Sequence, residues 1–346
     1  MEAAVLHGAK DIRVERFKMP VVLPGMVLLK IKRAGICGSD LHYFEDGYIG
    51  SFVPSRPFIL GHELTAEVVA VNDNGKPMPS IGSRVTVNPA RACGYCGFCK
   101  SGRMNLCRKT IMLGSGSTTP PTDGAMAEYV AVRADQCHVL PDNVDDGFGA
   151  MIEPLAVGLH AIKQAGTVAG KQVLVTGGGT IGLLTALCAR AFGAMAIVVS
   201  DVVAERRKSA SMLAVDATVN PTDRNFQEQI SQFTEDGFDV VFEASGARPA
   251  LRQAFDIIKP GGKIIQIGSV GNDDIPLPAN MLMIKEIELI GSFRYGNIFD
   301  EAIELVSTGK INLSPFITDV LPLEEITKAM HLGADKVHSL KVQIDI

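Results

Sequence analysis

Tryptophan is absent from this chain of 346 residues, and aromatic residues of all kinds make up only 6% of it. No apolar run approaches the roughly 18 residues that a membrane-spanning helix needs. The first residues, Met1 to His7, do not lead from a basic stretch into an apolar one, as a secretory signal peptide does. We therefore expect a soluble, cytoplasmic protein that makes no contact with a membrane.

The chain also lacks an excess of positive charge. It has 33 Lys and Arg against 38 Asp and Glu, for a net charge of −5, and both signs are dispersed along its length. This balance argues against a nucleic-acid partner. The 35 glycines follow no fixed period, no internal repeat is visible, and the length is sufficient for about two domains.

The first 150 residues contain short apolar segments separated by proline and glycine. Segments 27–31, 67–71 and 84–87 have the composition of strands, and irregular polar stretches such as 91–107 and 115–123 lie between them. This pattern predicts a β-barrel-like domain that carries long functional loops.

From about residue 153 the pattern alternates between strand and helix. Continuous apolar strands are predicted at 172–176, 196–200, 239–243 and 263–268, with helices at 153–165, 181–192, 204–214 and 247–258. Alternation of this kind, with strands that are apolar throughout, is typical of a parallel sheet buried on both faces. After residue 292 a helix at 301–308 and a strand at 339–346 are expected to return to the first domain.

Four of the seven cysteines, Cys93, Cys96, Cys99 and Cys107, lie within fifteen positions. Gaps of two residues allow tight turns to bring consecutive sulfurs to one point, so four thiolates can surround one Zn²⁺. Such a site has no open position and is structural. Four unrelated thiols or two disulfides are the alternatives, but disulfides are rare in reducing compartments. The remaining Cys137 and Cys188 lie in apolar surroundings and are expected to be inert buried thiols.

The segment 177–182, Gly-Gly-Gly-Thr-Ile-Gly, matches the dinucleotide-binding pattern G-x-G-x-x-G. The match gains weight because a buried strand precedes it, an apolar helix follows, and Asp201 lies 19 residues beyond Gly182. The glycines allow close approach of a pyrophosphate to the helix N-terminus. Asp201 would bind the adenosine ribose and repel a 2′-phosphate, which favours NAD over NADP, while Arg206 flanks the adenine or softens that exclusion.

A second group of chemically active residues includes Cys37, His62 and Glu63, with Glu153 at the junction of the two domains. A thiolate, an imidazole and a carboxylate with one open position are what a catalytic zinc requires. Spacing alone also allows each of these residues to be structural.

Together these motifs resemble the zinc-dependent medium-chain dehydrogenase family, in particular its sorbitol dehydrogenase and L-idonate 5-dehydrogenase branch. The resemblance covers essentially the whole chain and rests on motifs in family order: Cys37-Gly-Ser-Asp-Leu-His42, Gly61-His62-Glu63, the four cysteines, Glu153-Pro154-Leu155, the glycine loop and Gly291-Ser-Phe-Arg294-Tyr295. It implies an α/β fold with a GroES-like β-barrel catalytic domain (1–153 and 292–346) and a Rossmann NAD-binding domain (154–291). It also implies one catalytic and one structural zinc per chain.

The resemblance assigns roles to individual residues. Cys37, His62 and a glutamate hold the catalytic zinc; the sorbitol branch uses the equivalent of Glu63, with Glu153 contacting metal-bound water or substrate, and the choice between the two stays open. A proton would leave through Ser39 and His42. The cofactor set comprises Gly177, Gly179, Thr180, Ile181, Gly182, Asp201, Arg206, Ser245, Ile267 and Gly268. Thr180 departs from the proline that relatives often have. Arg294, Tyr43 and Tyr295 are the expected substrate residues, whereas Asp40 is expected to be structural.

We therefore expect an enzyme that transfers a hydride from a secondary alcohol of a polyhydroxy substrate to NAD. A sugar acid such as L-idonate, oxidised at C5, is the first candidate, and a polyol such as sorbitol or xylitol is the alternative. A non-catalytic dinucleotide-binding redox sensor is the competing class. The apolar segment 277–290, with Met281 and Met283, suggests a homodimer or homotetramer.

Overall fold

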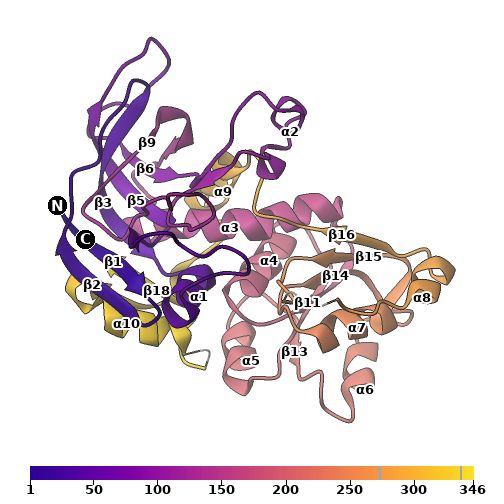
Figure 1. The fold of residues 1–346 in the computed structure, drawn as a ribbon. Helices are drawn as coiled ribbons and strands as arrows, with labels where there is room; N and C mark the ends of the chain where they lie inside the picture. Colours follow the sequence, from indigo (N-terminus) through magenta and orange to yellow (C-terminus); the bar gives the residue numbers. More distant parts are fainter. Residues whose placement is uncertain (272–273, 336) are drawn as a thin grey trace. The chain divides into compact units, whose positions relative to one another are not determined.

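The structure is a computed structural model that describes residues 1–271, 274–335 and 337–346. It divides into two units, Met1–Glu153 with Phe299–Ile346, and Pro154–Ile298 (Figure 1). The boundary at which the chain returns to the first unit lies after Ile298, later than the expected boundary after residue 291. The reason is that the Ser292 N–H donates to the Gln266 carbonyl at 2.8 Å, so the chain stays attached to the sheet of the second unit.

The first unit is built mainly from antiparallel strands. Its largest sheet has the order β10-β6-β5-β3-β18-β17, with β9 also paired to β3; a second sheet has the order β2-β1-β4, and β7 pairs with β8. The strands are β1 (Glu2–Gly8), β2 (Asp11–Arg16), β3 (Met26–Gly35), β4 (Phe58–Ile59), β5 (Glu63–Val71), β6 (Arg84–Val87), β7 (Ala90–Arg91), β8 (Ile111–Met112), β9 (Tyr129–Arg133), β10 (Cys137–Val139), β17 (Ile317–Pro322) and β18 (Lys341–Asp345). Val27, Leu29 and Ile31, at alternate positions of β3, are fully buried and form part of its core.

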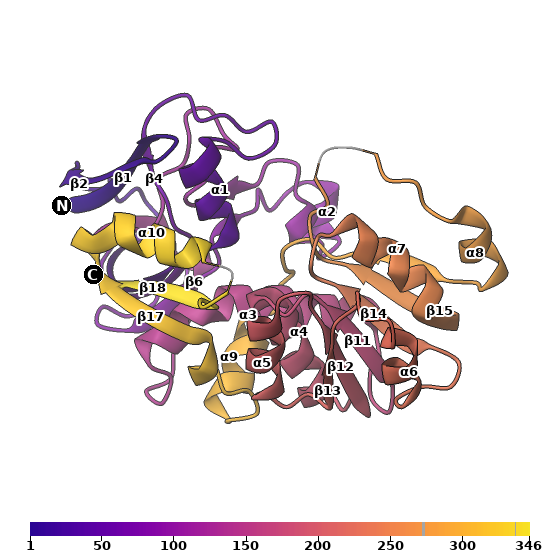
Figure 2. The same cartoon turned by 90° about the horizontal axis from the view of Figure 1, so that it is seen from below.

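The end of the chain returns to the first unit, as the sequence predicts. β18 pairs antiparallel with β3 and parallel with β17, and α10 (Ile326–Ala334) lies beside β18 (Figure 2). The other helices of this unit are α1 (Gly38–Asp46), α2 (Gly97–Lys100) and α9 (Phe299–Ser307). The return matters for the site, because it brings Lys341 at the start of β18 next to residues from the first quarter of the chain.

The second unit contains a parallel sheet of six strands with the order β13-β12-β11-β14-β15-β16. Its strands are β11 (Gln172–Thr176), β12 (Ala196–Ser200), β13 (Ala217–Val219), β14 (Phe238–Glu243), β15 (Ile258–Gln266) and β16 (Glu288–Gly291); its helices are α4 (Thr180–Ala191), α5 (Ala204–Ser211), α6 (Phe226–Ser231), α7 (Arg248–Ile257) and α8 (Ala279–Ile284). The order reverses between β11 and β14, which is where dinucleotides bind in sheets of this type.

Several expected boundaries differ from the structure. The helix expected from residue 153 is α3 (Asp146–Ala165), and it starts earlier because the Asp145 carboxylate accepts the Phe148 N–H at 2.7 Å. α5 ends at Ser211 rather than 214, and β15 runs over Ile258–Gln266 rather than 263–268. In the described part of the chain, no helix combines the length and apolar character needed to cross a membrane.

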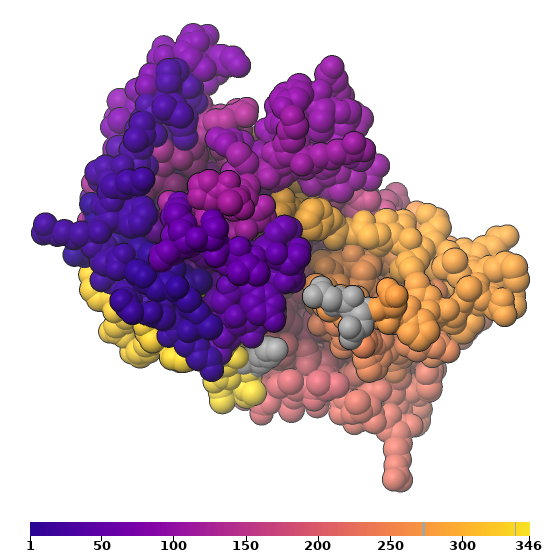
Figure 3. Space-filling model, viewed as in Figure 1, coloured from indigo at the N-terminus to yellow at the C-terminus, as the bar shows by residue number. Residues whose placement is uncertain are grey.

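The edge of the parallel sheet carries exposed apolar side chains. β16 is the last strand in the sheet order, and the α8 segment beside it in the sequence lies at the surface of the second unit (Figure 3, orange). The exposed apolar residues of this edge patch are Leu277, Leu282, Met283, Ile284, Leu289 and Phe293.

Candidate metal centres and cofactor site

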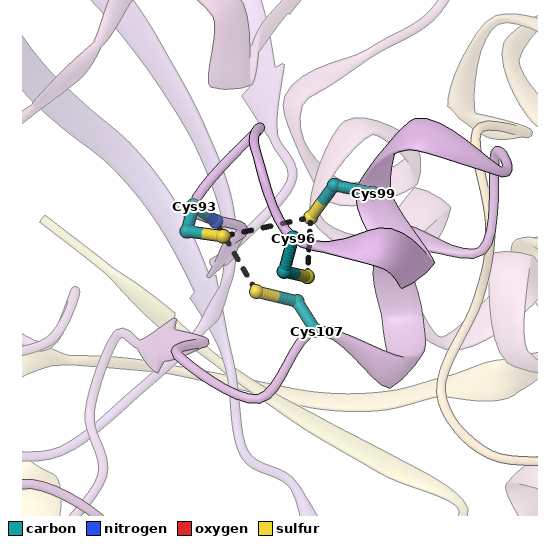
Figure 4. Close-up of side chains that lie close together, drawn as sticks. All are labelled: Cys93, Cys96, Cys99 and Cys107. Carbon is teal, nitrogen blue, oxygen red and sulfur yellow. Dashed lines mark hydrogen bonds between the residues drawn. The ribbon is translucent and has the colours of Figure 1, made fainter.

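The four clustered cysteines converge on one point in the first unit. Their sulfur atoms all lie within 4.8 Å of one another, with 3.5 Å between the sulfurs of Cys96 and Cys99 and 3.9 Å between those of Cys93 and Cys99 (Figure 4). All four are free thiols, which excludes the two disulfides in this structure. Four sulfurs at these distances suit a tetrahedral ion such as zinc with no position left for substrate.

Among the four cysteines, the surroundings of Cys107 favour the thiolate. Burial raises the pKa of the Cys107 thiol, but the N–H groups of Cys93 and Lys109, at 3.2 and 3.4 Å from its sulfur, outweigh burial and lower that pKa to about 6. Residues 91–110 include five Lys or Arg and no Asp or Glu. A tetrathiolate zinc centre carries a net charge of −2, so this basic segment compensates the charge of the ion and its ligands together.

The second cluster forms where β3 and β5 end side by side. The antiparallel register pairs Gly35 with Glu63, so Cys37, just after β3, comes close to His62 and Glu63 at the start of β5. Ligand atoms of Cys37, His62 and Glu63 lie within 4.8 Å of one another. A Cβ on Gly35 would lie only 2.1 Å from a Glu63 oxygen, so only glycine leaves room for that carboxylate.

Asp40 joins the two loops of this cluster, which confirms its expected structural role. The carboxylate is fully buried and accepts the Cys37 N–H at 2.9 Å and the Gly61 N–H at 3.1 Å. It thereby caps the first turn of α1 and fixes the residue next to His62. Burial raises the pKa of Asp40.

Lys341 is the residue that sequence reasoning missed in this cluster. Its ammonium donates to both Glu63 oxygens at 2.7 Å and to the Ile36 carbonyl at 3.0 Å, and both side chains are buried. Burial lowers the pKa of Lys341, but the negative charges of Glu63, Cys37 and Glu153 outweigh it and raise that pKa. Both Glu63 oxygens are therefore already engaged by a cation.

The residues of this cluster fit a divalent cation. His62 Nδ1 is buried without a hydrogen-bond partner in the described structure, and a carboxylate oxygen of Asp40 is 3.7 Å away. Burial lowers the pKa of His62, yet the negative groups Asp40, Cys37 and Glu153 raise it well above its usual value. A site this negative, with a thiol, an imidazole and carboxylates at its centre, matches the ligand preferences of zinc.

The three expected functional residues on α1, Ser39, His42 and Tyr43, differ in how far they are exposed to solvent. His42 is exposed and lies 3.4 Å from Asp46 one turn later, and Ser39 is partly buried on the same helix. Tyr43 is buried, packs edge-to-face on Phe58 and accepts the Gly116 N–H at 2.9 Å. Tyr43 thus has a structural role in the core, and its contact with substrate stays a prediction.

The glycine loop of the second unit forms a tight turn between β11 and α4. Gly177 has a φ of 94°, and a Cβ on Gly182 would come within 1.9 Å of the Gly177 carbonyl oxygen. Asp201, at the end of β12, supports the turn: one oxygen accepts the Gly178 N–H at 2.7 Å and the other accepts the Val203 N–H at 2.8 Å. The N-terminus of α4, where Thr180 and Ile181 lie, is an anion-binding position.

Arg206 lies beside this turn. Its guanidinium is 3.8 Å from the Asp201 carboxylate and would be 3.7 Å from a Cβ on Gly179. A positive side chain here is placed to attract phosphate groups, whereas Asp201 repels them. The two residues therefore act in opposite directions on an adenosine phosphate.

The other expected cofactor residues follow β14 and β15. Ser245 lies after β14, and Ile267 and Gly268 after β15. All three donate their backbone N–H groups to Glu243: Ser245 to its carboxylate, and Ile267 and Gly268 to its carbonyl. Glu243 is fully buried at the end of β14, and the sequence analysis did not single it out. The sequence shows only that a glutamate ends the apolar segment 239–243, and it does not reveal the partners of that glutamate.

Arg294 and Tyr295 also lie in the second unit. Arg294 has a φ of 52°, a left-handed conformation that is costly for a residue other than glycine, asparagine or aspartate. Its guanidinium lies 4.9 Å from the centre of the exposed Phe293 ring, while Tyr295 is buried. Strain of this kind is often retained where a side chain has a function.

An all-parallel sheet with a glycine turn, a mainly antiparallel unit and two cysteine-containing clusters that could hold a metal ion are typical of a zinc-dependent dehydrogenase. Two family models match: residues 23–142 match the alcohol dehydrogenase GroES-like domain, and residues 180–308 match the zinc-binding dehydrogenase model. Sorbitol dehydrogenase of Bacillus subtilis (strain 168) is 36% identical over 99% of this chain and 97% of that protein. D-xylulose reductase A of Aspergillus oryzae is 34% identical over 94% of this chain and 92% of that protein.

Among solved structures, L-idonate 5-dehydrogenase from Escherichia coli K-12 is similar with a TM-score of 0.93. It is 32% identical, and the match covers 100% of this chain and 98% of that one. The chain therefore belongs to the zinc-dependent medium-chain dehydrogenase family, with its GroES-like and Rossmann domains. It is an oxidoreductase that uses zinc and NAD(P), and its relatives support activity on polyols or sugars.

Proposed function

We propose that this enzyme oxidises a secondary alcohol of a sugar acid, in the manner of an L-idonate 5-dehydrogenase, and reduces NAD. The substrate C–H bond gives a hydride to the cofactor, the O–H bond gives a proton to solvent, and the product is a ketone. The observation that carries the proposal is the cluster of Cys37, His62 and Glu63, in a chain related to dehydrogenases of polyhydroxy compounds.

Cys37, His62 and Glu63 would hold the catalytic ion, and Cys93, Cys96, Cys99 and Cys107 the structural one. The bound catalytic zinc supplies a Lewis acid that lowers the pKa of a substrate hydroxyl. Because Lys341 engages both oxygens of Glu63, that carboxylate is a weaker ligand than a free one. Glu153 is buried nearby, and its negative charge acts on His62, so it is the second carboxylate available to the ion or the substrate.

Two other residues of the first unit, Ser39 and His42, would move the proton. Ser39 lies two positions after Cys37, and its hydroxyl can pass a proton onward. The exposed imidazole of His42, 3.4 Å from Asp46, would pass the proton to water. Seven free thiols support a reducing compartment such as the cytoplasm.

The substrate is the finer part of the proposal. Arg294 can form a forked pair of hydrogen bonds to a carboxylate, and its strained backbone supports a function for the side chain. We expect kcat/KM for L-idonate to exceed that for sorbitol and xylitol by about tenfold or more, as one charge-assisted interaction provides. NADH formation across a panel of aldonates and alditols measures this ratio. A preference for the alditols would establish the polyol dehydrogenase alternative instead.

We also propose that two copies of the chain associate through the edge patch. Among the described residues no strand pairs with the outer edge of β16, and exposed Met283, Ile284 and Leu289 lie on or near it. A second copy of the same strand, running antiparallel, satisfies both the backbone groups and the apolar side chains.

Sedimentation velocity tests this association. We expect the wild-type protein to have twice or four times the mass of one chain, and Ile284→Lys to shift it to a smaller species. Val21→Lys is the matched control, because Val21 is equally exposed at 73%, against 74% for Ile284, but belongs to the other unit. A monomeric wild-type protein, or an Ile284→Lys variant of unchanged mass, contradicts this interface.

A further inference from the structure

Glu243 is a fully buried carboxylate at the end of β14. One oxygen accepts hydrogen bonds from the Thr176 hydroxyl at 3.2 Å, the Ser245 N–H at 2.9 Å and the Gly246 N–H at 3.0 Å, and also from the Ser245 hydroxyl. The other oxygen accepts the Gln266 side-chain N–H at 2.7 Å. Every one of these donors is neutral, whereas buried carboxylates usually pair with a cation.

The donors come from the ends of three adjacent strands. The register places Thr176 of β11 opposite Glu243, and Glu243 opposite Gln266 of β15. The Glu243 carbonyl also accepts the N–H groups of Ile267 and Gly268 at 2.8 and 2.9 Å. One residue therefore holds both loops that carry the expected cofactor residues Ser245, Ile267 and Gly268.

These loops leave no room for displacement toward one another. A Cβ on Gly268 would lie 2.3 Å from the Gly246 nitrogen, and a Cβ on Gly177 would lie 2.9 Å from the Ser245 backbone. A shift in the Glu243 contacts would therefore be transmitted to the glycine turn itself.

The position of Glu243 along the sheet indicates which half of the cofactor it faces. The pyrophosphate site is the turn after β11, and Asp201 on the β12 side is expected to bind the adenosine ribose. The other half of a dinucleotide then extends over the ends of β14 and β15, where Glu243 lies. This step rests on the proposed NAD site.

We propose that Glu243 is a positioning residue for the nicotinamide half of the cofactor, and that its buried charge favours NAD⁺ over NADH. The hydrogen bonds fix the loops that contact the cofactor. The charge acts because the nicotinamide ring is cationic in NAD⁺ and neutral in NADH, and because a low-dielectric interior screens a buried carboxylate weakly.

Two variants separate position from charge. Glu243→Gln keeps the size of the side chain and removes its charge. The Gln266 side-chain oxygen has no hydrogen-bond partner in the described residues, so it can accept from the new amide if Gln266 rotates and gives up its 2.6 Å bond to the Gly268 carbonyl. Glu243→Asp keeps the charge but is too short to reach all the donors. We expect Glu243→Gln to weaken NAD⁺ binding about tenfold and NADH binding by less than about twofold. We expect Glu243→Asp to weaken both by the same factor.

NADH fluorescence titration, with NAD⁺ measured by competition, gives both dissociation constants without substrate turnover. Thermal unfolding reports whether each variant is folded. Equal weakening of both cofactors in Glu243→Gln overturns the charge effect, and wild-type binding in Glu243→Asp overturns the positioning role, even if the Gln variant does not fold. A wild-type protein that binds neither cofactor would instead refute the proposed function.

Discussion

Cys37→Ser is expected to lower kcat/KM by about a thousandfold or more, because a hydroxyl is a poor zinc ligand at neutral pH and a thiolate is a strong one. The backbone should tolerate the change, since the Cys37 N–H that caps α1 through Asp40 is not altered. NADH binding should be preserved, because the glycine turn and Asp201 belong to the other unit.

Metal analysis gives this prediction a second readout. The wild-type protein should contain about two zinc ions per chain and Cys37→Ser about one, retained by the four cysteines near α2, since two separate clusters of ligands are present. Cys137→Ser is the matched control. Burial raises the pKa of the Cys137 thiol to about 12, so this residue is inert and its substitution should leave activity and zinc content unchanged.

The outcome also decides between classes of protein. An enzyme loses turnover and one zinc ion together, while NADH still binds with wild-type affinity. A dinucleotide-binding redox sensor would show no turnover in the wild-type protein either. Turnover that survives Cys37→Ser would refute the role of the Cys37 cluster in catalysis.

The parallel sheet was predictable because its strands are buried on both faces. Residues 173–175 and 196–199 are uninterrupted apolar runs, and the structure places the strands β11 and β12 there. The start of α3 was less predictable. Two glycines and few strong helix formers lie between Asp146 and Met151, and capping by Asp145 decides the start.

The site was predictable only as far as its motifs are local. Cys37 and His62 belong to short motifs, and strand register brings them together. Lys341 pairs with Glu63 across 278 positions of sequence, and no local pattern marks a lysine as the buried partner of a ligand. Glu243 is similar: its role depends on Gln266 and Thr176 in neighbouring strands. Long-range contacts between polar groups therefore limit what sequence alone reveals.

Asp201→Asn is expected to shift the preference of the enzyme from NAD toward NADP. The carboxylate repels a 2′-phosphate, and the positive charge of Arg206, 3.8 Å from that carboxylate, attracts it. The ratio of kcat/KM for NADP to that for NAD should rise about a hundredfold, since like-charge repulsion across a binding site costs several kcal/mol.

Part of the rise in this ratio should come from a lower kcat/KM for NAD. Both Asp201 oxygens accept backbone N–H groups, from Gly178 and Val203, and an amide can accept only one of them while its NH₂ opposes the other. Steady-state kinetics with each cofactor separates this loss from the gain with NADP. The double variant Asp201→Asn with Arg206→Ala should lose the gain with NADP but keep the loss with NAD. If the single variant keeps the wild-type ratio, Asp201 does not select the cofactor, and the discrimination must come from another residue of the turn.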